Sequence, residues 1–137
     1  MTIKHHLLAA TLALSGLASA QDSYPTKAIT LTVPNPPGGV VDTSARLLNE
    51  PLARILGQPV VIDNKAGGSG NVAYGAVARA KADGYNLLIS YSAYHVGNPA
   101  LSPSLPWEAK DFAPVALLTV ATPVLAVPPS APGHNLK

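Results

Sequence analysis

The chain has 137 residues, a length that suits one domain, and 47% of them are hydrophobic while only 12% are charged. This composition excludes a disordered chain, and a net charge of +2 with scattered Lys and Arg argues against a nucleic-acid-binding surface. The absence of cysteine excludes disulfides and thiolate metal sites.

The first twenty residues have the pattern of a secretory signal peptide. Lys4 supplies a short positive region, residues 7–17 are apolar, and Ala18-Ser19-Ala20 fits an A-x-A cleavage site. The apolar stretch is too short to span a membrane, which takes about 20 apolar residues. We therefore expect cleavage after Ala20 and a periplasmic location for the mature chain.

Beyond the leader, the sequence alternates between strand and helix patterns. The expected elements are strand 28–33, helix 42–56, strand 59–63, helix 72–82 and strand 85–90. Asp42 is the candidate N-cap of the first helix. The second strand is almost continuously apolar, which is typical of a strand that is covered on both faces.

The remaining third of the chain is less regular. Residues 91–99 form a polar loop in this interpretation, and residues 101–110 are irregular. Two further short strands are expected at 115–120 and 123–127. The tail, residues 128–137, is rich in proline and resembles a linker.

Alternation of strands and helices predicts an α/β fold with parallel strands and right-handed crossovers. In such a sheet every loop from a strand to a helix lies at the carboxyl edge, where ligands bind. The loops 34–42, 64–71 and 91–99 should therefore converge at one rim.

Enzyme functions have weak support. Residues 68–73 fit G-x-G-x-x-A, but the acidic residue expected about 20 positions later is missing, so a dinucleotide-dependent enzyme is a distant alternative. No G-x-S-x-G elbow or rim carboxylate pair is present, and His95 stands alone on its loop. We expect no catalytic residue, no metal site and no cofactor.

The rim residues fit binding better than catalysis. The rim offers neutral hydrogen-bond donors of two kinds. The backbone N–H groups of Gly38 and Gly39 are expected to be uncovered, and the side chains that can donate are Thr43, Ser69, Asn71, Tyr91, Ser92, Tyr94 and Asn98. Only Lys65 adds a positive charge. Each bond from such a donor to a charged group contributes about 1.5–3 kcal/mol, which suits reversible binding of small organic anions.

Seven ordered sequence blocks resemble the Bug family, the periplasmic solute receptors of tripartite tricarboxylate transporters. They are Tyr24-Pro25-Thr26-Lys27 with Ile29-Thr30-Leu31, Pro34 to Arg46 (P-x-P-P-G-G-x-x-D-x-x-A-R), Leu56 to Val61, Gly67 to Asn71, Asp83 to Leu88, Asn98 to Leu101, and Asp111 to Val115. They are spread, in this order, over nearly the whole sequence that follows the leader.

The resemblance implies a fold like that of type II periplasmic binding proteins, in which two α/β domains close on a ligand. It implies a di- or tricarboxylate, an acidic amino acid or an aromatic acid as ligand, and membrane transporter subunits as partners of a monomeric receptor. An alternative is that the receptor presents its ligand to a membrane sensor protein. The ligand-binding residues that it implies are Pro37, Gly38, Gly39, Asp42, Ser69, Asn71, Ser92 and Tyr94.

Three features qualify this resemblance. Asp42 could cap its helix or bond an amino group of the ligand, and we favour capping. Asn35 stands where the family often has a bulky apolar or aromatic residue, which alters the wall of the pocket. Family members are also much longer. The resemblance therefore implies an amino-terminal fragment, with residues 21–127 as the first domain, 128–137 as a hinge, and the second wall of the cleft missing.

Overall fold

The computed structural model describes residues 24–120, 126–128 and 130, which contain a three-stranded parallel sheet of order β2-β1-β3. The principal elements are β1 (Ile29–Val33), α2 (Val40–Leu56), β2 (Val60–Asn64), α3 (Asn71–Ala78), β3 (Asn86–Leu88) and α4 (Asn98–Leu101). The leader lies outside the described residues, as do most of the strand expected at 123–127 and most of the tail. The predicted α/β architecture with parallel strands is confirmed.

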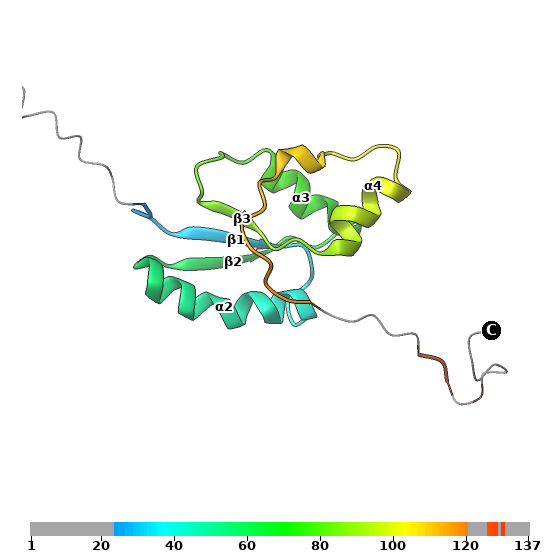
Figure 1. The fold of residues 1–137 in the computed structure, drawn as a ribbon, viewed down its shortest axis with the longest axis horizontal. Coiled ribbons are helices and arrows are strands. Elements are labelled where there is room, and N and C mark those ends of the chain that lie inside the picture. The colour runs from blue at the N-terminus through cyan, green and yellow to red at the C-terminus, as the bar shows by residue number, and fades with distance from the viewer. Residues whose placement is uncertain (1–23, 121–125, 129, 131–137) are drawn as a thin grey trace, which may run out of the picture.

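The core lies around the central strand β1. Ile29, Leu31 and Val33 are nearly inaccessible, and Thr32 on the opposite face of the strand is only 3% exposed. In Figure 1, α2 lies on one side of the strands and α3 and α4 lie on the other. Helices on both faces of the sheet explain why β1 is buried on both sides, although only one of its faces is apolar and the other carries threonine.

The second strand was expected to be covered on both faces, and this is wrong for β2. It is an edge strand of the described sheet, and Val61 on it is 50% exposed. A continuous apolar run does not reveal where a strand lies in the sheet, because strand order depends on pairing between distant segments.

Helix α2 begins two residues before the expected start. Its N-cap is Gly39, which has an extended backbone, so Asp42 occupies the third helical position and its prediction as N-cap is wrong. Ala45 is fully buried and packs with Leu31 and Val33 of β1. Gly57 ends the helix with φ of 67°, the left-handed conformation that glycine adopts without strain.

The segment 91–99 was predicted as a loop, and most of it is helical. A π-helical turn (Ala93–Gly97) leads directly into α4, and the N–H groups of Tyr94 and His95 both donate to the Tyr91 carbonyl, each at 2.9 Å. Pro99 fits here because the first turn of a helix does not need its missing N–H group. The polar composition of the segment conceals this helical backbone.

The strand predicted at 115–120 is also wrong. These residues have no strand pairing, and Val115, Leu117 and Val120 are more than 80% exposed. Apolar composition gives a segment the propensity for a strand but does not supply the neighbouring strand that its backbone groups need. No helix in the described part of the chain is long and apolar enough to cross a bilayer.

Candidate functional site

The three loops that follow the strands meet at the carboxyl edge of the sheet, as predicted. The Asn35 Nδ2 of the first loop donates to the Tyr94 hydroxyl at 3.3 Å. The Asn98 Nδ2 of the third segment donates to the Ser69 carbonyl of the second loop at 2.8 Å. These bonds join segments that are far apart in sequence, so the rim is one continuous surface.

The buried side chain of Asp42, in the first turn of α2, hydrogen-bonds to the first loop. Its Oδ2 accepts the Gly38 N–H and the Arg46 Nε, both at 2.8 Å, and its Oδ1 accepts the Asn64 Nδ2 at 2.9 Å. Hydrogen bonds from Arg46, Gly38 and Asn64 hold the pKa of the Asp42 carboxyl far below its ordinary value. With 1% of its surface exposed, this carboxylate stabilises the loop and faces away from solvent.

The two glycines of the first loop are not as open as expected. Gly38 has φ of 86°, which favours glycine, but its N–H is bound to Asp42. The Gly39 N–H donates to the Pro36 carbonyl at 3.4 Å. The expectation that both amides are uncovered is therefore wrong. The adjacent Pro37 is exposed on the turn.

The donors that this loop does offer belong to the start of α2. The first N–H groups of a helix have no intrahelical partner, and no described side chain caps α2 behind its Gly39 N-cap. Helix α3 also begins at this rim behind a glycine, Gly70, without a cap from a described side chain. It continues from a 3-10 turn (Gly68–Gly70), however, and its first N–H group, that of Asn71, already donates to the Gly68 carbonyl. Two helix N-termini with their partial positive charge therefore lie at one edge of the sheet.

Gly70 allows the second and third loops to approach each other. A Cβ at this position would lie 2.5 Å from Cδ2 of Tyr94 and 2.9 Å from its Cγ, and the residue has φ of 83°. Only glycine meets both conditions without a shift of the Tyr94 ring. The missing side chain at Gly70 therefore gives the Tyr94 ring its space at the rim.

The two other residues predicted in the second loop differ in their availability. Ser69 is exposed and has φ of 53°, a rare conformation for a residue with a side chain. The Asn71 Oδ1 accepts the Trp107 Nε1 at 2.8 Å and the Asn98 Nδ2 at 3.3 Å. The side-chain oxygen of Asn71 therefore holds neighbouring segments together.

The third segment, residues 91–99, packs on a cluster of aromatic side chains and carries hydroxyl groups at the rim. Tyr74 of α3 is fully buried, and its ring lies tilted against that of Trp107 with 4.6 Å between the ring centroids. The rings of His95 and Phe112 complete this cluster. Because His95 belongs to the π-helical turn, this cluster packs the turn against α3 and Trp107. Ser92 is exposed, and its hydroxyl makes no hydrogen bond within the described residues.

The charges near the rim are already compensated. The Lys65 Nζ lies 2.7 Å from the Asp63 Oδ2, so the one positive charge expected at the rim is paired. Arg46, which the sequence argument overlooked, neutralises Asp42. The groups left to meet a ligand are neutral hydroxyls and helix N–H groups.

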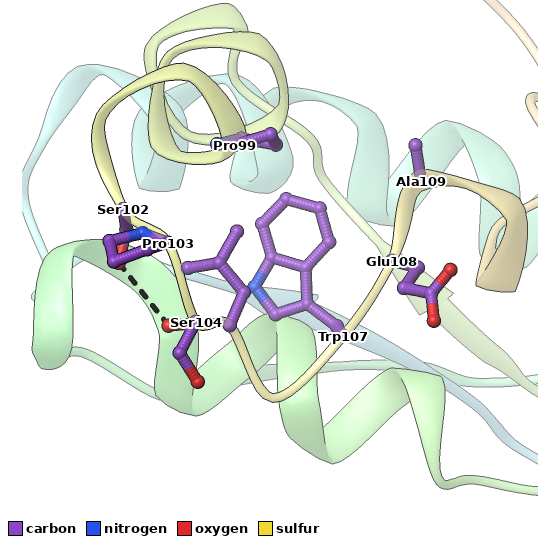
Figure 2. A pocket seen from close by; sticks show the side chains of 8 residues that line it. Pro99, Ser102, Pro103, Ser104, Trp107, Glu108 and Ala109 are labelled. Carbon is purple, nitrogen blue, oxygen red and sulfur yellow. Dashed lines mark hydrogen bonds between the residues drawn. The ribbon is translucent and has the colours of Figure 1, made fainter.

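Two cavities lie away from this rim. One, of about 430 Å³, is an open pocket against Trp107 between α4 and residues 102–109, shown in Figure 2. The other, of about 420 Å³, is apolar and lies between α2 and the sheet, near Leu52 and Leu87. None of the eight predicted ligand-binding residues lines either cavity. The rim is therefore distinct from both hollows.

Four residues that organise the rim were not among the eight predicted ligand-binding residues, although Asn98 was expected as a rim donor and Asn35 as part of the pocket wall. Gly70 admits Tyr94, Asn35 bonds to it, and Asn64 and Asn98 tie neighbouring loops together. Asn64 directly follows the second expected strand, and this position at the carboxyl edge of the sheet was the one sequence feature that could have predicted its role. The roles of the other three depend on contacts that sequence spacing does not reveal.

Comparison with known proteins gives a consistent result. The family described as "Tripartite tricarboxylate transporter family receptor" matches residues 44–137. Protein BugT of Bordetella pertussis is 39% identical over 122 residues, which are 86% of this chain and 37% of BugT. A solved structure of a periplasmic transporter is 42% identical with a TM-score of 0.62 and covers 64% of this chain and 29% of that one.

A second solved structure contains a ligand. MatC (Rpa3494) from Rhodopseudomonas palustris with bound malate is 41% identical, with a TM-score of 0.67 over 69% of this chain and 33% of that one. The chain thus spans about a third of the length of these relatives.

Proposed function

The chain belongs to the tripartite tricarboxylate transporter receptor family, and we propose that its three rim loops bind a carboxylate of a small organic acid. In this proposal the ligand is delivered to membrane transporter subunits, and the protein acts in the periplasm after loss of its leader. MatC, with bound malate, and the periplasmic transporter structure support both the class of ligand and the compartment.

The observation that carries the proposal is the pair of helix N-termini at the rim. Helices α2 and α3 both begin behind a glycine N-cap without a side-chain cap among the described residues. The partial positive charge of both helix ends and the first N–H groups of α2 favour a bound anion, and the neutral hydroxyls of Ser92 and Tyr94 add further donors. The Arg46 guanidinium, bonded to Asp42, offsets the negative charge of this carboxylate and so reduces its repulsion of that anion.

We propose that these loops form one wall of the binding site. The chain spans about a third of its relatives, and a ligand enclosed from one side keeps only part of its possible burial. We therefore expect this chain to bind organic acids with a dissociation constant of about 1 mM, equivalent to roughly −4 kcal/mol.

The test is an NMR titration of the ¹⁵N-labelled chain with malate, because this method detects millimolar binding. We expect the amide signals of Val40, Asn71 and Ser92 to shift together and saturate. The neutral diamide of malate is the matched control, and it should cause much smaller shifts. Equal shifts with the diamide, or none with malate at about 20 mM, would contradict the proposal.

The proposed compartment is tested separately. Expression of the chain in a Gram-negative host should release a mature protein into the periplasmic fraction, and N-terminal sequencing should begin at Gln21. An uncleaved chain, still carrying residues 1–20 and found in the cytoplasmic fraction, would contradict export.

A further inference from the structure

Asn35 links two of the rim segments. It lies in the first loop, two residues after β1 ends, and its Nδ2 donates to the Tyr94 hydroxyl oxygen at 3.3 Å. Its main-chain carbonyl accepts the Asn64 Nδ2 at 3.0 Å. Asn64 in turn donates to Asp42 at 2.9 Å, so the loop position of Asn35 is fixed by the buried network beneath it.

The direction of the bond to Tyr94 matters for anion binding. An amide N–H that donates to the phenol oxygen occupies an acceptor position of that oxygen and leaves the phenol proton unused. Within the described residues, the Tyr94 hydroxyl donates no hydrogen bond. We propose that Asn35 is a positioning residue, which directs the Tyr94 hydroxyl proton toward the ligand carboxylate; this inference rests on the proposed function.

The other half of the Asn35 amide supports a role beyond stability. Its Oδ1 is buried and has no hydrogen-bond partner among the described residues. A buried acceptor without a partner destabilises the folded state, and an apolar side chain of similar size would avoid that penalty. Asparagine is thus a poor choice for packing at this position, while its N–H group is well placed for Tyr94.

The rim offers the Tyr94 proton few competing acceptors. The Asp42 oxygens already accept bonds from Gly38, Arg46 and Asn64, and Asp63 is paired with Lys65. The Tyr94 ring packs directly against Gly70, and its hydroxyl is bonded to Asn35. A phenol fixed in this way donates to a carboxylate more strongly than to a neutral acceptor.

The test compares affinity and stability in matched variants, with malate as the probe. Asn35→Leu should weaken malate binding about 5-fold in the NMR titration, while the Tm stays equal to or above that of the wild type. Asn35→Asp should weaken binding further, because its carboxylate accepts the phenol proton and repels the ligand. Asn86→Leu, at the amino end of β3, is the control and should leave the malate affinity unchanged.

A double-mutant comparison separates positioning from a general structural role. Tyr94→Phe should weaken binding about as much as Asn35→Leu, and the double variant should be no worse than Tyr94→Phe alone. Additive losses would overturn the inference, as would a Tm that falls in parallel with affinity in Asn35→Leu.

The two proposals fail in distinguishable ways. If the wild-type chain does not respond to malate, the proposed function and this inference both fall. If the wild type binds malate and Asn35→Leu binds it equally well, the inference alone is overturned. If Asn35→Leu does not fold, the claim that asparagine is unfavourable for stability is refuted, and the inference with it.

Discussion

The loop after β1 and the turn after β3 lie side by side at the rim, but they use their polar groups differently. In the first, the Asp42 carboxylate is 1% exposed and accepts three hydrogen bonds from within the chain. In the second, the Ser92 hydroxyl is exposed and forms no bond within the described residues. The charged group therefore builds the rim, and neutral groups are left to meet a ligand.

This difference separates residues that shape the rim from residues that could touch a ligand. Changes in the first group should lower stability, and binding should fall only as a consequence. Changes in the second group should lower affinity while the melting temperature hardly moves. The largest expected effects on stability come from the residues that shape the rim.

Gly70→Ala should be the most damaging substitution. The new Cβ would overlap the Tyr94 ring and the residue would keep an unfavourable φ of 83°, so we expect a loss of about 2–4 kcal/mol in chemical denaturation. Gly57→Ala is the matched control, because Gly57 has φ of 67° and nothing within 4 Å of its added Cβ. Equal losses in the two variants would show that the Tyr94 contact is unimportant.

Asp42→Asn should be the next largest effect. The carboxylate accepts on both oxygens, from Gly38 and Arg46 on one and from Asn64 on the other, whereas an amide has a single acceptor oxygen and no charge. At least one of these bonds and the ion pair with Arg46 are lost, so we expect the Tm to fall by roughly 10 °C. Asp83→Asn, at the opposite end of the sheet and more exposed, is the control and should lower the Tm less. A Tm unchanged by Asp42→Asn would contradict the structural role of this carboxylate.

The stability of the folded chain should also depend on pH through Asp42. Because its pKa is lowered in the folded state, the unfolded chain takes up this proton first as the pH falls below about 4. The stabilisation is complete above that pH and is lost progressively toward the lowered pKa. Thermal melts between pH 5 and pH 2 should therefore show a shallower decline in Asp42→Asn than in the wild type, and parallel curves would contradict this.

Ser92→Ala should have the smallest effect on stability. The hydroxyl is exposed and unbonded within the described residues, so the Tm should change by less than about 2 °C. The malate affinity measured by NMR should fall about 3-fold if this hydroxyl meets the ligand. A large fall in Tm would place Ser92 among the residues that shape the rim and would remove the contrast between the two regions.

The sequence was sufficient to predict the α/β fold, the parallel strands and the rim. These features follow from local signals: apolar periodicity, glycine turns between strand and helix, and the rule that parallel strands place such loops at one edge. The first helix was found within two residues of its start. Family resemblance, carried by the same loop motifs, is confirmed by the match at residues 44–137.

The rest depended on contacts between distant residues. Asp42 looked like an N-cap because helix patterns do not resolve the first two residues of α2. Of its three hydrogen-bond partners, Asn64 lies 22 positions away in the sequence. The segment 115–120 had the composition of a strand but no pairing partner. The role of Asn35 could not be predicted, since its bond to Tyr94 spans 59 positions.

The most direct test is a crystal structure of this chain with malate. We predict that one malate carboxylate lies within hydrogen-bond distance of the first N–H groups of α2 and close to the start of α3, with the Tyr94 hydroxyl donating to it. Malate located instead in the pocket beside Trp107 or in the apolar cavity near Leu52, with the rim unoccupied, would contradict the account.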